Sequence, residues 1–504
     1  MKVIIPASGE GLRFKNAGYV DPKPLINVND KKIIDYVLNC FSANDEFFII
    51  SSPSTYDRMD EYLTICKMSG IQITHILYEG PKLGPVGCIL GVAGELSKYI
   101  KEHDEVIVSY CDYGLDWNYY DFLQFIDEVK PDGAIPCYTG YHPHLENENN
   151  VYAACKVVDS SNQVYVVKEK YNSNNRETEL WSAGLYYFKS FGIMNGAFTK
   201  LVEAKDSINS EYYVSLAYNY MEGLNIYAYD KIKKFYQFGT PEDFEVARKN
   251  LNMLVNIENE PTTIKNTVVL SAGRGERFLN LGFKQPKPFL PIGRSYLAKY
   301  IYSSLNNIGN IRFVGSKDHS LFWDSSGLPV KYIEPNKIGA AYSYKSGCSD
   351  IEGDTLIVPC DLIAKHITPL FNKLKETCDA IIFTAEPNDY ALENPNSFAW
   401  VSGHQSKIHN ISIKEKHNST NELMVLIGSF WVKDNKVLLE SIDDIIENNK
   451  TVNGEYYLDS AFKNMLDAGL NVKYIKLEKY FSLGTYPEYN MSRYWLDGEF
   501  FLYE

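Results

Sequence analysis

Apolar and polar positions alternate along the first fifty residues in a way that predicts strands and helices in turn. Apolar runs occur at residues 3–5 and 46–51, and residues 31–41 between them carry apolar side chains at helical spacing. Short apolar runs are typical of buried strands, and apolar positions three or four residues apart are typical of a helix that covers them. A strand, a helix and a second strand in this order indicate an α/β fold with a parallel sheet.

The same alternation continues to about residue 110, and shorter strands follow it. Residues 72–79 and 105–110 predict strands, and a segment rich in glycine and proline, 80–87, separates the first of them from a predicted helix. From residue 151 the apolar runs become shorter and are separated by turns. We therefore expect a mixed, mainly parallel sheet flanked by helices.

The opening stretch of the chain occurs a second time. In residues 2–25 an apolar strand leads into a small glycine-containing loop, an arginine and a Pro-Lys-Pro clamp, and residues 267–290 repeat this order. The clamp lysines, Lys23 and Lys287, are 264 positions apart, as are the two loops. A repeat of this length indicates two domains of one kind. We expect domain 1 at residues 1–255, a polar, proline-bearing linker at 256–266 and domain 2 at 267–504.

Both glycine loops have the composition of a phosphate-binding loop. Glycine allows backbone N–H groups to approach an anion without interference from a Cβ atom. The arginine adds a forked charge and the lysine a compact one, and the flanking prolines restrict the direction of the lysine. The dinucleotide-binding fingerprint is excluded because it requires glycine where Phe14 stands. The expected phosphate-binding residues are Ala7, Ser8, Gly9, Glu10, Gly11, Arg13 and Lys23, and in the second copy Ala272, Gly273, Gly275, Arg277 and Lys287.

An acidic residue follows one predicted strand in each copy. Asp112 ends the strand at 105–110, and Asp361 ends the strand that corresponds to it. Ligands bind at the carboxyl ends of parallel strands, and a carboxylate there can hold Mg²⁺. A helix cap is the alternative interpretation of such an aspartate.

Taken together, these motifs resemble the signature of the sugar-1-phosphate nucleotidylyltransferases. The resemblance rests on an apolar strand, the pattern A-x-G-x-G-x-R-F and the P-K-P clamp, each present twice. It implies two tandem Rossmann-like, GT-A-like domains that use Mg²⁺, held by Asp112 and Asp361. Tyr113–Trp117 is also reminiscent of the lipopolysaccharide and capsule branch of that family, which implies a role in making an activated precursor for a surface polysaccharide.

The resemblance also implies where the nucleobase and the acceptor bind. The nucleobase loop would contain Gly84, Pro85 and Gly87 in domain 1 and Gly339 in domain 2. The residues implied in acceptor binding are Glu169, Lys170, Gly184 and Glu211 in domain 1, and Glu415, Lys416 and Glu455 in domain 2. The chain departs from the family at the position of a second metal-binding aspartate, which is Gln237 in the first copy and Ser482 in the second.

Composition narrows the range of partners. The 504 residues carry 50 Lys and Arg against 64 Asp and Glu, a net charge of −14, which argues against nucleic acid or an anionic membrane as the main partner. Nine cysteines without a C-x-x-C pair suggest reduced thiols. No apolar run approaches the length of a membrane span, and no signal segment is apparent. We expect a cytoplasmic protein, and a homo-oligomer is left open.

The expected reaction is attack by an acceptor phosphate on the α-phosphorus of an NTP, with release of pyrophosphate. Three hypotheses follow: two working sites with different acceptors, one working site beside a regulatory nucleotide-binding copy, or a nucleotide-sugar glycosyltransferase. The third requires a D-x-D element, and Asp112-Tyr113-Gly114 lacks its second aspartate. The sequence identifies neither the base nor the acceptor, which could be a sugar 1-phosphate or another small phosphorylated metabolite.

Overall fold

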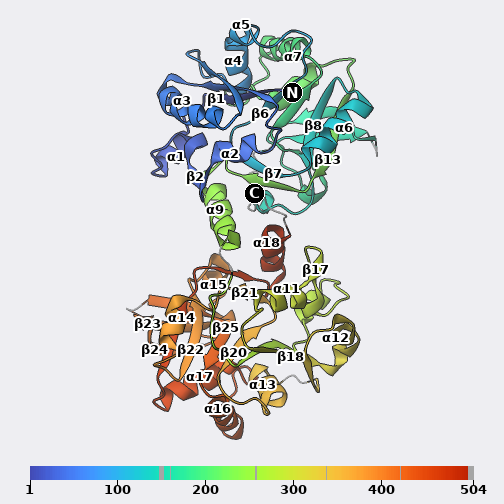
Figure 1. Ribbon diagram of the computed structural model, residues 1–504. Helices are drawn as coiled ribbons and strands as arrows, with labels where there is room; N and C mark the ends of the chain where they lie inside the picture. The colour runs from blue at the N-terminus through green and yellow to red at the C-terminus, as the bar shows by residue number, and fades with distance from the viewer. Residues whose placement is uncertain (147–151, 159–160, 256–257, 336–337, 420–421, 498–504) are drawn as a thin grey trace. The chain divides into compact units, whose positions relative to one another are not determined.

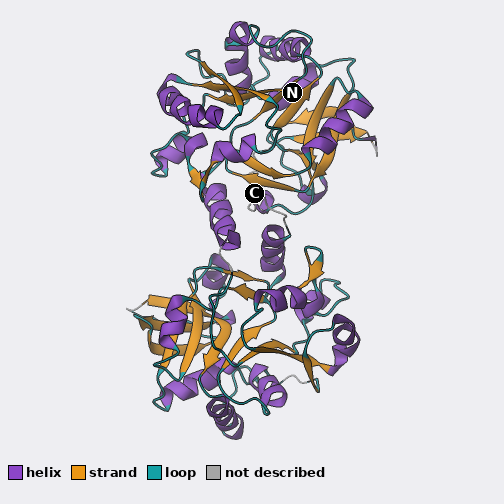
Figure 2. Cartoon of the chain, in the orientation of Figure 1, coloured by secondary structure: helices purple, strands orange, loops and turns teal. Residues whose placement is uncertain are grey.

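The chain divides into two compact units, Met1–Asn252 and Met253–Asp497 (Figure 1). This division falls within helix α9 (Pro241–Val255) rather than in the polar segment that follows it. Helices and strands alternate along both units (Figure 2). The structure, a computed structural model, describes residues 1–146, 152–158, 161–255, 258–335, 338–419 and 422–497.

Unit 1 is built on one ten-stranded mixed sheet. In sheet order the strands are β11 (Leu180–Ser182), β9 (Ala154–Val158), β10 (Gln163–Lys168), β13 (Ile226–Ile232), β8 (Gly133–Tyr138), β12 (Leu185–Phe188), β6 (Val106–Ser109), β1 (Lys2–Ala7), β4 (Glu46–Ser51) and β5 (Gln72–Leu77). The four strands at the β5 end pair in parallel, as the apolar runs predict.

Helices cover both faces of this sheet. Along β1, Ile4 packs with one hydrophobic cluster, and Val3 and Ile5 pack with the other, because successive side chains of a strand point to opposite faces. The first cluster contains residues of α4 (Gly84–Gly91), α7 (Phe191–Glu203) and α8 (Val214–Ala217). The second contains residues of α2 (Ile33–Leu38), α3 (Pro53–Met68) and α6 (Tyr119–Val129). Shorter helices are α1 (Leu12–Asn16) and α5 (Ala93–Leu96).

Unit 2 has a nine-stranded mixed sheet of the same plan. In sheet order the strands are β19 (Val330–Ile333), β18 (Asn310–Ser316), β15 (Asn266–Ser271), β20 (Thr355–Pro359), β25 (Glu422–Val432), β22 (Ala380–Ala385), β26 (Val472–Lys476), β24 (Lys407–Ile413) and β23 (Ala399–His404). Its helices are α10 (Glu276–Leu279), α11 (Leu297–Ser304), α12 (Ser320–Ser326), α13 (Ala340–Cys348), α14 (Pro369–Leu374), α15 (Asp389–Glu393), α16 (Asn435–Glu447), α17 (Leu458–Asp467) and α18 (Tyr486–Leu496).

The far end of each sheet closes on itself. In unit 2, β25 pairs with both β22 and β23, so that β25, β22, β26, β24 and β23 form a small five-stranded barrel. In unit 1, β11 pairs with both β9 and β8 and closes β8, β13, β10 and β9 in the same way. The α/β class is confirmed, but the prediction of mainly parallel sheets is wrong. Over the described strands antiparallel pairings outnumber parallel ones, because turns rather than crossover helices join the short strands of the closed part.

A pair of short ribbons lies beside the sheets. In unit 1, β7 (Tyr113–Asp116) pairs with β14 (Lys234–Gln237), and in unit 2, β21 (Leu362–Ala364) pairs with β27 (Tyr480–Ser482). Two small hairpins complete the strands: β2 (Asn27–Val28) with β3 (Lys31–Lys32), and β16 (Pro291–Ile292) with β17 (Ser295–Tyr296).

Much of the predicted linker is attached to unit 2. Asn259 donates to the carbonyl of Ser304 and accepts from the backbone of Ile367, each bond being 2.8–3.0 Å long. Lys365 forms an ion pair with Glu260 at 3.0 Å. The segment from residue 258 therefore packs as part of unit 2, while residues 256 and 257 lie outside the described residues.

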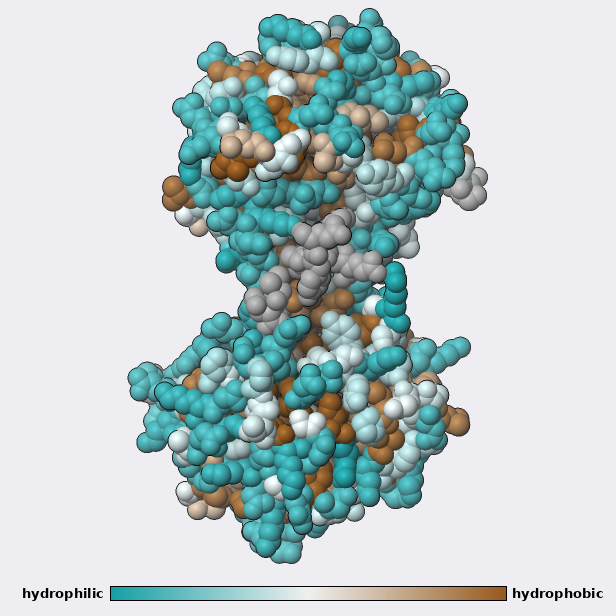
Figure 3. All heavy atoms as spheres, viewed as in Figure 1, coloured by the Kyte–Doolittle hydropathy of each residue, from teal (hydrophilic) through white to brown (hydrophobic). Residues whose placement is uncertain are grey.

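Hydrophilic residues cover most of the face in Figure 3, and hydrophobic ones form separate patches among them. Over the described ranges, no helix has both the length and the apolar character needed to cross a bilayer.

Candidate active site

A glycine loop joins β1 to α1 in unit 1 and β15 to α10 in unit 2. Gly11 and Gly275 precede these helices with φ angles of 62° and 65°, which glycine adopts at little cost. A Cβ atom on them would lie 3.5 Å and 3.1 Å from the Cβ atoms of Lys23 and Lys287. The last glycine of each loop therefore allows the clamp lysine to pack directly against the loop.

The middle of each loop has an open side. No heavy atom lies within 4 Å of the place where a Cβ on Gly9 or Gly273 would stand. Ala7 before the first loop is buried, whereas Ser8, Glu10 and Ala272 are partly exposed or exposed. An anion could therefore approach the loop backbone from this side.

The clamp lysines contact the strand-end aspartates in both units. Lys23 forms an ion pair with Asp112 and donates to the carbonyl of Gly239 at 3.0 Å. Lys287 forms an ion pair with Asp361 and donates to the carbonyl of Gly484 at 3.2 Å. The lysine side chains are both 15% exposed, and the aspartates are 25% and 26% exposed. The same pocket is thus built twice, from residues that the sequence placed in one pattern.

The short ribbons bring the third segment of each pocket into place. The backbone N–H of Phe238, next to β14, donates to the carbonyl of Asp112 at 3.0 Å. In unit 2 the N–H of Leu483 donates to the carbonyl of Asp361 at 2.8 Å. These bonds fix the glycine carbonyls that the lysines contact. We call the arrangement of Lys23, Asp112 and the neighbouring glycine loop site 1, and that of Lys287, Asp361 and its loop site 2.

The predicted nucleobase loop is in part a helix. Gly84 begins α4 with a φ of 78°, so Pro85 and Gly87 lie in the first turn of that helix and not in a loop before it. A Cβ on Gly84 would lie 3.0 Å from the Cβ of Glu211 and from the backbone N of Tyr212. The N–H of Tyr212 donates to the carbonyl of Leu83 at 2.9 Å, and the N–H of Val86 donates to the carbonyl of Tyr212 at 3.2 Å. The end of this loop is therefore bonded to the segment that carries Glu211, and we call this contact between the two segments the clasp.

Unit 2 has the same clasp in a tighter form. Gly339 precedes α13 with a φ of 117°, and a Cβ there would lie 2.4 Å from the carbonyl O of Tyr456. The N–H of Tyr456 donates to the carbonyl of Ile338 at 2.7 Å, and the N–H of Ala341 donates to the carbonyl of Tyr456 at 3.0 Å. Only a residue without a side chain fits between these partners.

In unit 1, a lysine that was predicted to bind the acceptor lies over a tyrosine ring. Lys170 has a φ of 50°, and its Nζ is 4.9 Å from the ring centroid of Tyr213. The hydroxyl of Tyr213 donates to Glu211 at 2.7 Å. An ammonium over an aromatic face is attracted by the ring, so Tyr213 and Glu211 together define where Lys170 rests.

In unit 2 the equivalent lysine is Lys414, and the predicted match to Lys416 is wrong. Lys414 has a φ of 58°, and its Nζ is 5.3 Å from the ring of Tyr457, which is also hydrogen-bonded to Glu455. Lys416 lies over Trp400 at 5.1 Å, and both it and Glu415 are exposed. The sequence Lys-Glu-Lys occurs at residues 168–170 and again at 414–416. The left-handed residue is the last lysine of the first copy, Lys170, but the first lysine of the second copy, Lys414.

Each acceptor-side lysine has a carboxyl group with a raised pKa nearby. Burial raises the pKa of Glu169 to about 7, and Ser215 donates a hydrogen bond to it. In unit 2, burial raises the pKa of Asp459 to about 6. Burial also lowers the pKa of Lys414; Asp459 opposes this shift, and the charge of Arg277 adds to it. Arg277 and Lys414 therefore place two positive charges near each other in unit 2.

A second pair of equivalent glycines interrupts the strands beside this pocket. Gly184 has a φ of 78°, and a Cβ on it would lie 3.2 Å from the ring of Tyr110. Gly428 has a φ of 74° and faces Pro359. Gly184 was predicted to admit the acceptor, and its positive φ and its contact with Tyr110 also require glycine here. The sequence analysis missed Gly428, Lys414 and Asp459, of which only Gly428 was visible in sequence, as a glycine within an apolar run.

Two family models match this chain. The model described as nucleotidyl transferase matches residues 2–252, and the model described as MobA-like NTP transferase domain matches residues 267–417. The chain carries two nucleotidyltransferase domains. They place the protein among the enzymes that transfer nucleotidyl groups, and units 1 and 2 are called domains 1 and 2 from here on.

The nucleotidyltransferase is similar to several known proteins. The bifunctional protein GlmU of Methanococcus aeolicus is 27% identical over 223 residues, which are 43% of this chain and 50% of the relative. GlmU of Methanococcus maripaludis is 21% identical over 211 residues, 40% of this chain and 47% of the relative. The chain thus spans about half the length of the curated relatives it matches. A solved nucleoside-diphosphate-sugar pyrophosphorylase from Vibrio cholerae RC9 is 21% identical, with a TM-score of 0.42 over 49% of this chain and 100% of that one.

The side chains of both domains fit an Mg²⁺ that arrives with a nucleotide. Among the described residues, no three His, Cys, Asp or Glu side chains are placed to hold a metal by themselves. Each site has one aspartate, and Mg²⁺ is commonly held by one or two carboxylates together with substrate phosphates and water. The Gln237 amide is already bonded to the hydroxyl of Tyr152 at 2.5 Å, so it does not replace the second aspartate directly.

Tyr113–Trp117, the segment that suggested the capsule branch, lies in the core of domain 1. Leu115, Asp116 and Trp117 are buried, and the Trp117 indole donates to the carbonyl of Cys40 at 3.0 Å. Its residues therefore have a structural explanation, and the branch of the family is not shown by them.

The raised pKa of Glu169 predicts a pH-dependent stability. The folded state holds the proton of the Glu169 carboxyl group more tightly than the unfolded chain does. The free energy of unfolding therefore falls as pH rises from about 4.5 to about 7. Glu169→Gln keeps the shape without the charge. We expect it to raise the unfolding temperature by a few degrees at pH 8 and to have almost no effect at pH 4, measured by differential scanning calorimetry.

The exposed Glu177 supplies the control, since Glu177→Gln removes the same charge from a solvated position. An equal gain from both substitutions at pH 8 would show that overall charge, and not burial of Glu169, is responsible.

Proposed function

We propose that each domain transfers a nucleoside monophosphate from an NTP to the phosphate of a small acceptor and releases pyrophosphate. The observation that carries this proposal is the lysine, aspartate and glycine-carbonyl arrangement that sites 1 and 2 share beside an open glycine loop. We also propose that domain 2 is a divergent copy of the Rossmann-like layout of domain 1.

The reaction needs charge stabilisation more than covalent chemistry. An oxygen of the acceptor phosphate forms a bond to the α-phosphorus, and the bond from that phosphorus to the β-phosphate oxygen breaks. Lys23 lies between the loop and Asp112, where its ammonium can turn from the carboxylate to a phosphate oxygen. The loop backbone around Gly9 and the side chain of Arg13 would hold the outer phosphates, and Lys170 would hold the acceptor phosphate.

Asp112 and Asp361 are the residues that would hold Mg²⁺, which when bound offsets the negative charge of the triphosphate. The backbone bonds from Phe238 and Leu483 to these aspartates keep each carboxylate next to its lysine. In site 2, the predicted position of the second carboxylate is held by Ser482 Oγ, a weaker donor for a cation.

We further propose that the acceptor is a sugar 1-phosphate and that the product is used to make a surface polysaccharide. The sugar 1-phosphate is supported by the family resemblance of the loop and clamp motifs, and the polysaccharide role by the resemblance of Tyr113–Trp117 alone. A nucleotide-sugar glycosyltransferase is disfavoured because Asp112-Tyr113-Gly114 lacks the second aspartate of a D-x-D element.

The proposal is tested by assaying the full chain with four NTPs and a panel of phosphorylated metabolites. Pyrophosphate release is followed with a coupled pyrophosphatase, and each reaction is compared with one that lacks the acceptor. We expect acceptor-dependent release with at least one combination. If pyrophosphate appears at the same rate without any acceptor, or not at all, nucleotidyl transfer to a small phosphate is the wrong reaction.

A further inference from the structure

The acceptor sides of the two sites can be aligned residue by residue. Lys170 and Lys414 share the left-handed conformation and lie over Tyr213 and Tyr457, and both pairs are 244 positions apart. Each tyrosine also stands immediately before a helix, α8 in domain 1 and α17 in domain 2. The backbone around the lysine is thus equivalent in the two domains.

In this alignment, the carboxyl group near the lysine stands at a different position in each domain. In site 1 it is Glu169, next to the lysine at the end of β10, and α8 contributes Ser215. The positions 244 residues later are Ile413, at the end of β24, and Asp459, on α17. Domain 2 therefore has an apolar residue where domain 1 has an acid, and an acid where domain 1 has a hydroxyl.

In site 1 the carboxylate belongs to the strand. Ser215 donates its hydroxyl to Glu169, and the backbone of Lys170 donates to the same carboxylate. A carboxylate has about four acceptor positions, so about two remain for a ligand. Glu169 is partly buried, at the end of β10. Its place next to Lys170 brings it beside any phosphate that this lysine holds.

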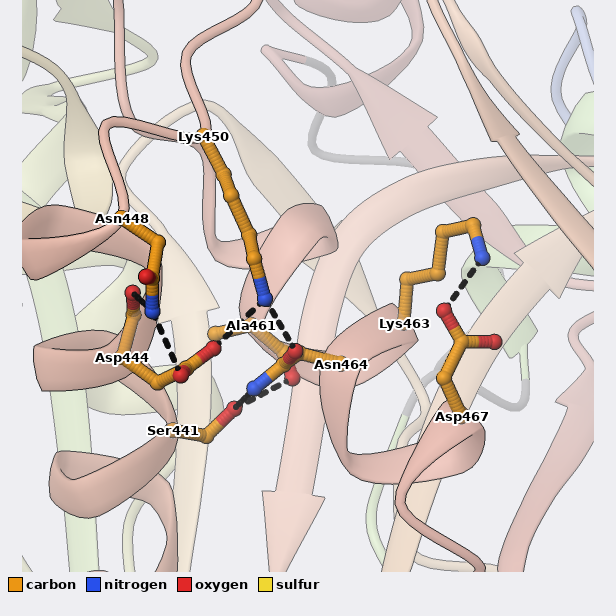
Figure 4. Close-up of polar contacts among 8 residues, drawn as sticks. All are labelled: Ser441, Asp444, Asn448, Lys450, Ala461, Lys463, Asn464 and Asp467. Atoms are coloured by element: carbon orange, nitrogen blue, oxygen red, sulfur yellow. Dashed lines mark hydrogen bonds and ion pairs between the residues drawn. The ribbon is translucent and has the colours of Figure 1, made fainter.

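In site 2 the carboxylate belongs to a helix that is firmly fixed. Figure 4 shows how α17 is tied to α16: Ser441 donates to the carbonyl of Ala461 at 2.8 Å, and Asn464 donates to Ser441 at 3.2 Å. Lys450 joins Asp444 and Asn464 across the same two helices. Ile413 packs partly buried against the hydrophobic core of the domain. The helix thus holds Asp459 close enough to Lys414 for their charges to interact.

We propose that this exchange of the carboxylate between strand and helix makes the two sites select different acceptors. The inference rests on the proposed function. Site 1 takes a phosphorylated acceptor with a hydroxyl that donates to Glu169 on the strand side of the phosphate. Site 2 takes an acceptor that is apolar on that side, against Ile413, and has its donor on the helix side, toward Asp459.

The chemistry predicts an asymmetric selectivity. A site built around a hydrogen bond to a substrate hydroxyl rejects the analogue that lacks it by about 10⁴–10⁵, because its polar group is left unpaired. An apolar position rejects an added hydroxyl by only about 10². Removal of one particular acceptor hydroxyl should therefore affect site 1 strongly, and its addition should affect site 2 mildly.

The test exchanges the two pairs of residues while one site is silenced. Site 1 is measured in Lys287→Ala protein and site 2 in Lys23→Ala protein, with acceptors that differ by single hydroxyl groups. Glu169→Ile with Ser215→Asp should give site 1 the acceptor ranking of site 2, and Ile413→Glu with Asp459→Ser should give the reverse. We expect the acceptor KM to change by at least 10-fold while the Kd for NTP, measured by calorimetry, stays within twofold.

Single substitutions separate selection from simple damage. Glu169→Ile alone should lose acceptor binding, and the added Ser215→Asp should restore it for acceptors of the site 2 type. Acceptor-dependent pyrophosphate release with the same ranking at both sites, or double exchanges that only lower activity, would overturn this inference and leave the proposed function intact. Absence of release from both sites with every acceptor would instead overturn the proposed function.

Discussion

Lys23→Ala is expected to lower kcat/KM for nucleotidyl transfer at site 1 by about 10²–10³ and to leave site 2 unchanged, with Lys287→Ala giving the opposite result. Each lysine is the one ammonium seen to bridge its strand-end aspartate and its glycine carbonyl. Its loss leaves the charge that develops at the α-phosphorus without a partner. The measurement is pyrophosphate release by each variant with an acceptor for each site.

Exposed lysines near the clamps provide matched controls. Lys15, on α1, and Lys284, three residues before Lys287, are both exposed. Their replacement by alanine removes the same charge, and we expect less than a twofold change. If one clamp variant keeps full activity with every acceptor, that domain is a regulatory copy and the chain has a single working site.

Gly339→Ala is expected to have the largest effect on the structure of a site. The added Cβ would lie 2.4 Å from the carbonyl O of Tyr456 and 2.7 Å from its N, in a backbone with a φ of 117°. Strained positions of this kind cost about 1–3 kcal/mol before any clash is counted. We expect domain 2 to unfold at least about 5 °C earlier in calorimetry, with loss of activity at site 2.

Substitutions at two other glycines serve as comparisons for Gly339→Ala. A Cβ at Gly84 would lie 3.0 Å from its neighbours in the equivalent clasp of domain 1. Gly84→Ala should therefore lower the unfolding temperature by less, and only that of domain 1. Gly196→Ala lies in α7, where no heavy atom is within 4 Å of its Cβ, and it should be neutral or slightly stabilising. An unchanged unfolding profile of Gly339→Ala would show that the clasp with Tyr456 does not hold the site together.

Acceptor selection links these predictions to the wider role of the protein. The clasp places the segments that carry Glu211 and Glu455 against the start of α4 and α13, so shared backbone bonds join the segments that we propose for nucleotide and acceptor binding. A domain that loses its clasp should therefore lose selectivity for both substrates together. In the proposed function, the clamp lysines serve the nucleotidyl transfer that both sites carry out. Glu169 and Asp459 select the acceptor, which differs between the sites.

The sequence predicted the parts of the site whose chemistry is local. The glycine loop, the Pro-Lys-Pro clamp and the strand-end aspartate each lie within a few residues, and the structure places Lys23 against Asp112 and Lys287 against Asp361. The repeat predicted that this arrangement occurs twice, because the same short pattern begins each copy. Parallel strands were predicted correctly for β5, β4, β1 and β6, whose apolar runs alternate with helices.

The sequence by itself determined that two domains carry phosphate loops with clamp lysines, because backbone freedom at glycine and restriction at proline are properties of neighbouring residues. Only the tertiary structure decided which lysine of the second K-E-K sequence enters site 2, since a left-handed turn at Lys414 is fixed by packing against Tyr457 on a distant helix. It also decided that the short strands close into a barrel and that Asp459 takes the place of Glu169. Both depend on contacts between segments far apart in the chain, which no local pattern records.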